Sequence, residues 1–375
     1  KVLLNDEVQL RAVSYILEKF KTKLTNRKSS TVAVSTSALA ISACGGGPSG
    51  SETQVKGFPS SYIAPTVNYV APTDVDPNFE ILKTAYNNPY WVSSLEMDQW
   101  DFHITPMLEN FERVIYYNFP ETPPEYDIFD LTGWEPATDE IKIATRDILS
   151  KFEDILNITF SESPMQTGVN VIAVSITKQA TTAGFSYFPN NFFEIGMDVF
   201  IADDYSSPRF LSEFNTNYEY EVLVHELGHA LGLKHPFEAH GANDEILSTY
   251  EDSSTNTAMS YNEDTATFDG TLRPLDWMAL TKLYGVKSTY NSGDDTYRFS
   301  SSSGTFIIDG AGVDMISAHS TSHDVTIDLR PGAHSHLGPK SSYITAGNQL
   351  TISHGSNIEN VVTGSGNDTV IGTDF

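Results

Sequence analysis

Residues 225–236 read HELGHALGLKHP and place three histidines and a glutamate at spacings that suit a metal site. On a helix, positions i and i+4 share one face, so the imidazoles of His225 and His229 can reach the same ion. Gly232 can take a left-handed conformation at low cost, which would end the helix and return His235 to that ion. Three neutral imidazoles without cysteine ligands favour Zn²⁺ with one open coordination position.

Glu226 adjoins this expected metal site without having to bind the ion. Zinc lowers the pKa of a bound water toward about 7. Glu226 is placed to accept that water's proton as the water attacks a carbonyl, and later to pass a proton to the leaving amine. These residues therefore predict metal-assisted hydrolysis of amide bonds. The alternative is a chance pair of helical histidines, and the added Gly232 and His235 argue against it.

Apolar patterns predict the elements that hold this site. Thr216 and Glu219 form a capping box before the motif helix, which Gly232 can end, and Gly285 is the stop signal of a later helix. The expected strands cover 113–119 and 169–176, and the expected helices cover about 141–156, 216–231 and 275–284.

The motif HELGHALGLKHP resembles the zinc signature of the metzincin peptidases, and Pro236 after the third histidine is typical of the serralysin branch. The stretch AMSY resembles that family's Met-turn. The resemblance implies that Met259 lies beneath the histidines and that Tyr261 is a further zinc ligand, which swings away to stabilise the oxyanion. LYG and SGDDTYRF are similar to the serralysin passage into the C-terminal domain. The likeness covers about 113–375 and is strongest in 219–299.

Two glycine-rich stretches, DGAGVDMIS at 309–317 and TGSGNDTVI at 363–371, share the frame x-G-x-G-x-D-x-apolar-x. In a parallel β-roll the glycines allow tight turns, and the aspartate with backbone carbonyls holds Ca²⁺. Ordinary Gly/Asp turns explain two copies equally well, and the resemblance to serralysins, which carry such repeats in this place, favours calcium. The predicted calcium-site residues are Asp294, Gly310, Gly312, Asp314, Gly364, Gly366 and Asp368.

The N-terminal region differs in composition from the rest of the chain. Basic residues precede TVAVSTSALAISACGGGPSG, which resembles the signal peptide and lipobox of a bacterial lipoprotein with a lipid anchor at Cys44. A flexible region with a chance cysteine is the alternative. The expected organisation is a signal or lipobox-like segment at 1–44, a flexible tether at 45–75, a catalytic domain at 76–285 with 76–112 as a candidate propeptide, and a calcium-binding β-roll domain, truncated, at 286–375.

The net charge of the chain limits the kinds of molecule that it is expected to bind. The chain has 49 acidic and 22 basic residues and a net charge of -27, which disfavours nucleic acid and anionic membrane surfaces and suits hard cations. A solubilising acidic surface explains the charge equally well. A single cysteine excludes an intramolecular disulfide. We expect a monomer that acts on protein or peptide substrates, either secreted or at the bacterial cell surface.

The sequence therefore predicts an α+β fold: a metzincin-type catalytic domain, with a twisted mixed sheet plus helices and the zinc site on a helix, followed by an all-β parallel β-roll type domain. The predicted function is an extracellular endopeptidase with Zn²⁺ and Ca²⁺ as cofactors. The stretch FEIGMDVFI (193–201) is the expected edge strand for an extended peptide.

Two alternatives stay open. A calcium-dependent surface or adhesion protein with an inactive metzincin domain would fit the repeats, although the presence of Glu226 and all three histidines speaks against it. Another metzincin, such as an astacin, also uses a tyrosine after the Met-turn, whereas Pro236 and the repeats favour a serralysin.

Overall fold

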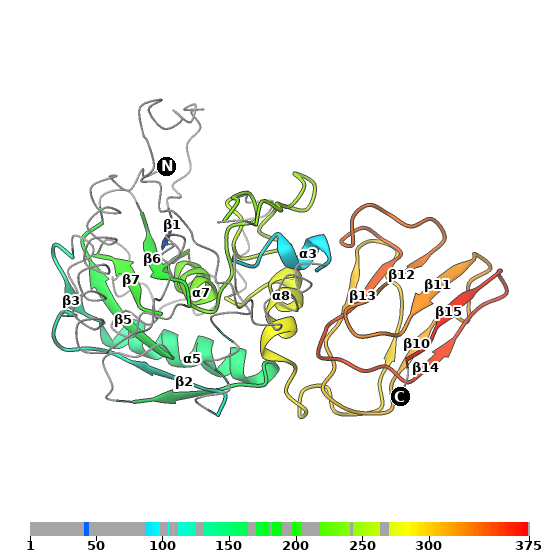
Figure 1. Cartoon of the computed structure of the whole chain (residues 1–375), viewed down its shortest axis with the longest axis horizontal. Coiled ribbons are helices and arrows are strands. Elements are labelled where there is room, and N and C mark those ends of the chain that lie inside the picture. The colour runs from blue at the N-terminus through cyan, green and yellow to red at the C-terminus, as the bar shows by residue number, and fades with distance from the viewer. Residues whose placement is uncertain are drawn as a thin grey trace, which may run out of the picture.

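The computed structural model contains an α+β domain and a smaller all-β domain that follows it in the chain (Figure 1). The residues it describes are 41–44, 88–97, 104, 108, 112–124, 131–163, 170–179, 182–189, 197–203, 218–240, 243–262 and 270–373. Most of the expected lipobox-like segment, the whole expected tether and most of 76–112 lie outside these ranges. No helix within them is long and apolar enough to cross a lipid bilayer.

The first domain is built on a seven-stranded mixed sheet, with the order β1-β6-β7-β5-β2-β4 and β3 paired to β5. Strands β4, β2, β5 and β7 run parallel, whereas β6 is antiparallel to β7, and β1 is antiparallel to β6. The strands expected at 113–119 and 169–176 are confirmed as β2 and β5. The strand bounds are β1 Ile41–Cys44, β2 Val114–Asn118, β3 Glu135–Pro136, β4 Thr159–Glu162, β5 Val171–Thr177, β6 Gly184–Tyr187 and β7 Val199–Ala202.

The prediction that residues 193–201 form an edge strand for an extended peptide is wrong. The described part of this range includes β7, which is hydrogen-bonded to β5 on one side and β6 on the other. The strand reads VFIA and is buried throughout, as a central strand covered on both faces should be. The antiparallel strand β6 lies one position further out, and its outer side pairs with β1.

Two helices pack against each other and against this sheet (Figure 1). The helix α5 (Asp139–Ile155) buries one apolar stripe at helical spacing, and the Thr138 side chain caps its start by accepting from Ile141 N at 3.3 Å. The helix α7 (Tyr218–Ala230) lies against β6, β7 and α5 and is buried on almost all sides. The motif helix is therefore part of the core. Thr216 of the expected capping box lies outside the described residues.

The glycines predicted to end helices do so. Gly232 has φ +102° just after α7, and Gly285 has φ +71° at the end of α8 (Pro274–Tyr284). Pro274 opens α8 at a position where its missing N–H is harmless. A short helix, α3 (Tyr90–Ser93), packs against α8 where the two domains meet (Figure 1).

The second domain consists of two sheets around a small apolar core. A three-stranded parallel sheet has the order β14-β10-β8, and a five-stranded sheet has the order β15-β11-β12-β13-β9. In the larger sheet the outer pairs are parallel, whereas β12 is antiparallel to both neighbours, so a regular parallel β-roll is not confirmed. The strand bounds are β8 Thr296–Tyr297, β9 Thr305–Ile307, β10 Met315–Ser317, β11 Val325–Asp328, β12 His334–Leu337, β13 Gln349–Ile352, β14 Asn360–Val362 and β15 Thr369–Ile371.

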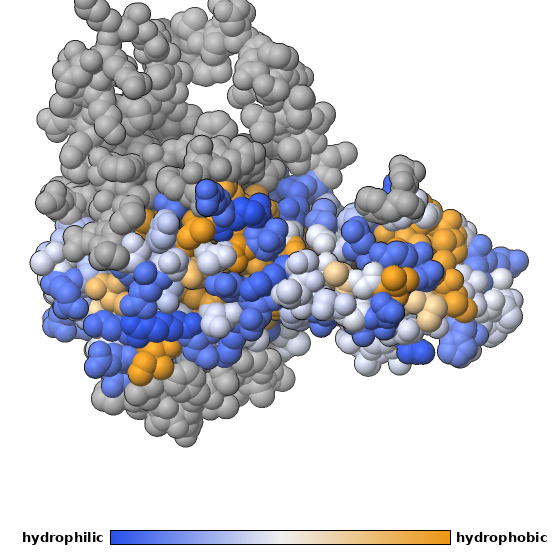
Figure 2. Space-filling view, turned by 90° about the horizontal axis from the view of Figure 1, so that it is seen from below, coloured by the Kyte–Doolittle hydropathy of each residue, from blue (hydrophilic) through white to orange (hydrophobic). Residues whose placement is uncertain are grey.

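The core of this domain is separate from the larger core of the first domain, and it includes Ile316, Ile327 and Leu350. Figure 2 shows apolar surface gathered on the second domain in the view from below. Its exposed large apolar side chains, within the described part of the chain, are Val313, Val362, Val370 and Ile371.

His354 makes the stability of this domain depend on pH. Burial, followed by the charge of Lys282 on α8, lowers the pKa of His354 to about 4. An unfolded chain takes up this proton near pH 6.5, so the folded state loses stability as the pH falls from 7 toward 4. We expect His354 to account for a loss of about 2 kcal/mol between pH 7.5 and pH 5. Urea unfolding at both values should show a smaller loss in His354→Gln, and an equal loss would contradict the assignment.

Candidate metal centre

Three histidine side chains meet at the end of α7 and just beyond it. His225 and His229 lie one turn apart on the helix, and His235 follows the turn at Gly232. Their Nε2 atoms are separated by 2.9 Å for 225 and 229, 3.3 Å for 225 and 235, and 3.2 Å for 229 and 235. All three residues are at most 5% exposed. The structure thus brings the three expected ligands to one point, where they could hold a metal ion.

The other ring nitrogen of each histidine faces a hydrogen-bond acceptor. Carbonyl and carboxylate oxygens only accept, so each Nδ1 carries the proton and donates it. Each Nε2 therefore directs an unprotonated lone pair at the shared centre. The acceptors are Ala258 O for His225 at 2.7 Å, Leu233 O for His229 at 2.6 Å and Glu238 Oε2 for His235 at 3.1 Å.

Three converging lone pairs repel one another unless a cation lies between them. Zinc bound to nitrogen at 2.0–2.1 Å in a tetrahedral arrangement would separate its ligands by about 3.3 Å, which is close to the observed spacing. Burial lowers the pKa of His225 to about 3 and that of His229 well below its ordinary value, so both rings are neutral at pH 7. Neutral nitrogen donors without thiolates fit Zn²⁺.

Tyr261 reaches the same centre from the segment after Met259. Its hydroxyl lies 2.9 Å from His235 Nε2, and its ring centre lies 5.0 Å from that of Phe237. Tyr261 is 39% exposed, unlike the histidines, so its side chain has open space on one side. This position is compatible with the predicted role of a ligand that can swing away.

Met259 is fully buried beneath the helix, where the resemblance places it. A β-carbon at Gly228 would lie 3.0 Å from Met259 Sδ, so the sulfur packs on the helix backbone next to His229. The preceding residue, Ala258, supplies the carbonyl that orients His225. The Met-turn segment therefore forms the floor of the metal centre.

Glu226 is fully buried, and its side chain lies against Gly184 at the start of β6. A β-carbon at Gly184 would lie 2.8 Å from Glu226 Cγ and 2.9 Å from Oε1. Any larger residue at position 184 would therefore push the carboxylate aside. Nothing in the sequence pattern singles out this glycine.

Replacing Gly184 by alanine should lower kcat for peptide cleavage by roughly tenfold to a hundredfold, because displacing a reacting group by about 1 Å has effects of this size. Bound zinc should be unchanged, since the added methyl group meets Glu226 and not a histidine. A matched control is Gly293→Ala, because no atom lies within 4 Å of a β-carbon there. Equal kcat values for the two variants would disprove the contact's importance.

Lys234 anchors the loop after α7, although its sequence context carries no signal for this role. Its ammonium group is buried and donates to the carbonyl oxygens of Ser94, Glu238 and Glu245 at 2.7, 2.8 and 2.9 Å. Burial lowers the pKa of Lys234 to about 8. These bonds hold the loop that carries Glu238, the acceptor for His235.

The start of α8 holds the Met-turn. Buried Asp276 accepts hydrogen bonds from Thr257 Oγ1 at 2.6 Å, from Ala258 N at 2.8 Å and from Arg273 N at 2.8 Å. The buried Arg273 side chain forms an ion pair at 2.8 Å with the largely buried Glu221 of α7. Asp276 and Arg273 together join α7, α8 and the Met-turn.

A second cluster of candidate ligands lies in the all-β domain. Asp295, Asp309 and Asp314 place carboxylate oxygens within 4.8 Å of one another. No hydrogen-bond donor in the described part of the chain reaches the buried Asp314 Oδ2. Burial raises the pKa of Asp314. Burial and the charge of Asp314 raise the pKa of Asp309 to about 6, although the hydrogen bond from Tyr297 acts in the opposite direction. Carboxylates that repel one another in this way fit a hard cation such as Ca²⁺.

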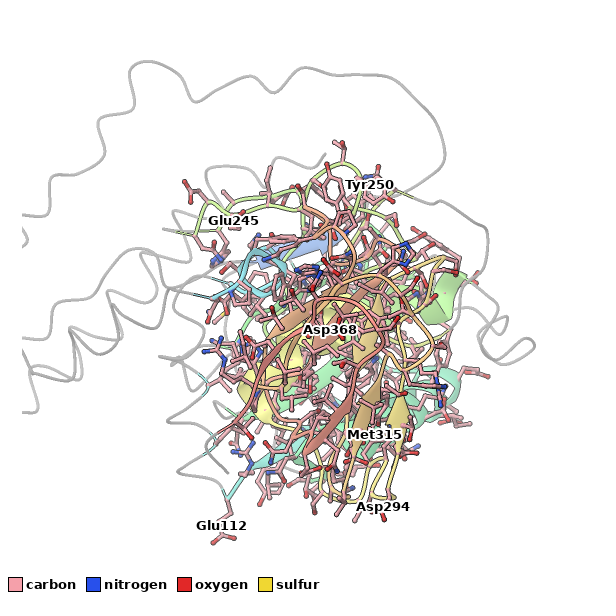
Figure 3. The ribbon with its side chains drawn as sticks, turned by 90° about the vertical axis from the view of Figure 1, so that its right-hand side faces the viewer. Glu112, Glu245, Tyr250, Asp294, Met315 and Asp368 are labelled. Carbon is pink, nitrogen blue, oxygen red and sulfur yellow. The ribbon has the colours of Figure 1, made fainter. Side chains whose placement is uncertain are left out.

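Asp294 and Asp368 are not members of this cluster. Each accepts a backbone N–H from a neighbouring turn, Asp294 from Val313 at 3.0 Å and Asp368 from Val325 at 3.1 Å. Figure 3 shows Asp294 at the lower end of the view and Asp368 near its middle, so the two lie apart. Of the three clustered aspartates, the sequence pattern identified only Asp314, although the other two lie next to residues it selected.

The four repeat glycines allow close stacking of turns. A β-carbon at any of them would overlap a carbonyl oxygen of an earlier turn. These carbonyls belong to Lys287 for Gly310, Gly293 for Gly312, Thr321 for Gly364 and His323 for Gly366.

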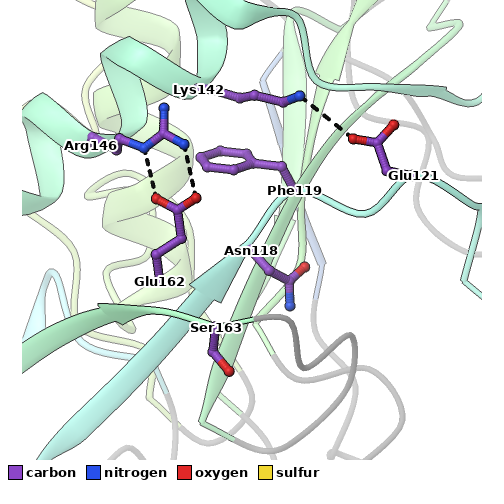
Figure 4. A pocket seen from close by; sticks show the side chains of 7 residues that line it. All are labelled: Asn118, Phe119, Glu121, Lys142, Arg146, Glu162 and Ser163. Atoms are coloured by element: carbon purple, nitrogen blue, oxygen red, sulfur yellow. Dashed lines mark hydrogen bonds and ion pairs between the residues drawn. The ribbon is translucent and has the colours of Figure 1, made fainter.

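A polar pocket of about 510 Å³ lies at the carboxyl ends of β2 and β4, beside α5 (Figure 4). None of the residues of the histidine centre lines it. Arg146 donates to both carboxylate oxygens of Glu162 at 2.7 and 2.8 Å, and its guanidinium lies 5.1 Å from the ring centre of Phe119. Lys142 faces Glu121 at 3.7 Å. The lining cations are thus balanced by lining carboxylates.

Comparisons with known proteins agree with this geometry. Residues 203–269, which contain the histidines, Glu226 and Tyr261, match the reprolysin-like metallopeptidase family M12B. Serralysin of Proteus mirabilis is 29% identical over 298 residues, which cover 69% of this chain and 59% of the relative. Serralysin C of Dickeya chrysanthemi is 30% identical over 256 residues, which cover 60% and 51%. Metallopeptidase AprA of Pseudomonas marginalis is 27% identical over 274 residues, which cover 64% and 56%.

The chain thus spans a little more than half the length of these curated relatives. The similarity extends beyond the metal-binding segment, since the match of 298 residues is far longer than the stretch 203–269. The chain is therefore similar to the serralysins over 69% of its length, and its histidine centre lies within the segment that matches the reprolysin-like metallopeptidase family.

Proposed function

We propose that this chain is a zinc-dependent endopeptidase that hydrolyses peptide bonds in proteins. The observation that carries this proposal is the convergence of three unprotonated imidazole nitrogens beside buried Glu226 and the Tyr261 hydroxyl. Purely structural zinc sites are closed by four protein ligands. Here the fourth group is a partly exposed tyrosine, which a substrate can displace. The names of the relatives, serralysin and metallopeptidase, support the same reaction.

His225, His229 and His235 would hold the zinc ion, which when bound lowers the pKa of a water molecule and polarises the peptide carbonyl. Glu226 accepts the proton of the attacking water and then delivers a proton to the leaving amine. Tyr261 turns away from His235 and donates a hydrogen bond to the carbonyl oxygen as negative charge develops there.

The substrate is a protein segment in extended conformation, bound along the outer side of β6. This side begins at Gly184, which packs on Glu226, so a strand added there passes next to the reacting groups. In the structure β1 takes this place, with Ile41 opposite Tyr187 and Cys44 opposite Gly184. The chain's own residues 41–44 therefore compete with substrate, in addition to any masking role of the candidate propeptide at 76–112.

Breaking the pairing of β1 should improve substrate binding. Proline at both Ser42 and Ala43 removes two consecutive backbone donors, one of which must face β6 in an antiparallel pair. We expect KM for a peptide substrate to fall roughly threefold to tenfold with kcat little changed. The matched control, Ser42→Ala with Ala43→Ser, keeps both donors and should behave as the unaltered chain. An unchanged KM in the proline variant would refute competition by β1.

We propose Ca²⁺ as the second cofactor, held in the all-β domain at the cluster that contains Asp314. In addition to burial, the charge of Asp314 raises the pKa of Asp309, and the charge of Asp295 raises that of Asp314. No donor in the described part of the chain reaches Asp314 Oδ2, and these observations together support the site. Calorimetric titration with Ca²⁺ should lose one binding event in Asp314→Asn. The same titration of Asp294→Asn tests the first of the other predicted positions. Titration of Asp368→Asn tests the second, which is the predicted site that also contains Gly364 and Gly366.

Metal removal tests the proposed function directly. The purified chain should contain about one zinc ion, cleave casein, and lose both properties on treatment with a chelator. Zinc added back should restore cleavage, and Ca²⁺ alone should not. A folded, zinc-loaded chain that cleaves nothing, even with the double proline substitution in β1, would favour a surface or adhesion protein with an inactive metzincin domain.

The remaining proposals concern the location of the protein, its oligomeric state and its domain boundaries. We propose a secreted or cell-surface monomer with a catalytic domain at 76–285 and a calcium-binding domain at 286–375. Lipobox processing would make Cys44 the lipidated N-terminal residue and remove residues 41–43 of β1, so mass spectrometry of the mature N-terminus decides whether β1 is present to pair with β6.

A further inference from the structure

Glu251 is a buried carboxylate that joins three distant parts of the chain. Its Oε2 accepts from the Tyr90 hydroxyl of α3 at 2.7 Å. Its Oε1 accepts from Thr345 N at 3.2 Å and Thr345 Oγ1 at 2.9 Å, both in the loop between β12 and β13. The Tyr90 hydroxyl in turn accepts from Ile344 N at 3.1 Å. Both oxygens of a fully buried side chain are thus used to hold the all-β domain against the first domain.

Further contacts stabilise this junction. Ile344 is 2% exposed and packs into the core of the first domain rather than that of its own. Tyr250, the residue before Glu251, stacks on Tyr343 with ring centres 4.5 Å apart (Figure 3 labels Tyr250). Burial, and then the bond to Glu251, raises the pKa of Tyr90 and keeps its hydroxyl protonated as a donor.

The segment that begins at Glu251 also holds both neighbours of Tyr261. Asp252 accepts from Ser260 Oγ at 2.6 Å and from Asn262 Nδ2 at 2.8 Å. A backbone bond of 2.8 Å joins Ser254 N to Asn262 O. Tyr261 therefore stands between two residues that are bonded to the segment 251–254.

Tyr261 depends on these bonds for its position. It is 39% exposed, whereas the three histidines are buried, so packing alone does not fix it, and its hydroxyl lies 2.9 Å from His235 Nε2. Because Asp252 is bonded to both flanks of the tyrosine, a shift of the adjacent Glu251 would be passed on to Tyr261.

We propose that Glu251 is a positioning residue for Tyr261, and that docking of the loop 341–347 on Glu251 couples the all-β domain to the metal centre. The inference rests on the proposed function, because it assumes that Tyr261 assists the reaction. It adds a residue outside every motif of the sequence and a reason why the two domains act as one unit.

The test is a double-mutant cycle with kcat, KM and zinc affinity as readouts. Glu251→Gln keeps shape and burial but replaces one of the two acceptor oxygens by a donor, so either the Tyr90 hydroxyl or Thr345 loses its acceptor. We expect it to lower kcat roughly tenfold and to weaken zinc binding by a similar factor, with KM nearly unchanged. In a Tyr261→Phe background the same substitution should have no further effect on either quantity.

Thr345→Val probes the coupling from the other domain, since it removes one bond to Glu251 without touching the first domain. It should lower kcat roughly threefold. Thr351→Val is its control, because Thr351 bonds His334 within the all-β domain and not Glu251. Additive effects of Glu251→Gln and Tyr261→Phe, or equal effects of the two threonine variants, would overturn the inference. The zinc-affinity cycle keeps this test independent of cleavage, so failure of the unaltered chain to cleave would count only against the proposed function.

Discussion

Glu226→Gln should leave about one zinc ion bound and lower kcat for peptide cleavage by roughly 10³-fold or more. Glutamine preserves the shape of a fully buried side chain and so keeps its packing against Gly184. Its amide cannot accept the proton of the attacking water, and general-base catalysis contributes about 10²- to 10⁴-fold. The histidines keep their acceptors in this variant, so zinc affinity should be unaffected.

The measurement is kcat on a casein-derived peptide together with zinc content by mass spectrometry. Glu219→Gln, two turns earlier on α7, is the control for loss of a negative charge from the same helix. It should cleave at nearly the unaltered rate. A Glu226→Gln variant that retains zinc and cleaves within threefold of the unaltered chain would show that another group takes the proton.

The local part of this site was predictable because local geometry is periodic. A spacing of four residues on a helix fixes the relation of His225 to His229, and a glycine that tolerates positive φ explains how the chain returns with His235. The strands β2 and β5 follow from short apolar runs, α5 follows from apolar residues at helical spacing, and α7 and α8 follow from apolar runs that end at Gly232 and Gly285.

The supporting contacts could not be predicted, because they join segments that are far apart in the sequence. Whether a strand lies inside a sheet or at its edge depends on pairing partners, and so the buried run VFIA at 199–202 was misplaced. Gly184, Lys234 and Glu251 have ordinary neighbours in the sequence. Their roles arise only when β6 meets α7, when α3 meets the loop after His235, and when the two domains dock.

Asp276→Ala should have the largest effect on stability among the substitutions considered. It would leave three buried donors without an acceptor, namely the Thr257 hydroxyl and the N–H groups of Ala258 and Arg273. Each unsatisfied group costs about 1–3 kcal/mol, so we expect the free energy of unfolding to fall by about 3–5 kcal/mol. Asp276→Asn retains part of the acceptor and removes a charge whose burial raises the pKa of Asp276 to about 6, so it should lose less.

Asp276→Ala should also weaken zinc binding. Ala258 donates its N–H to Asp276, and its carbonyl orients His225. Loss of such an outer partner lowers metal affinity by about tenfold to a hundredfold. Urea unfolding of the zinc-free chain and competition with a chelator measure the two effects separately. Asp139→Ala, at an exposed position near the start of α5, is the control and should change neither by much. The contradicting result is an Asp276→Ala variant that unfolds more easily and yet binds zinc as tightly as the unaltered chain. That result would show that the Met-turn keeps its position without its bonds to α8, and that Asp276 does not support His225 through Ala258.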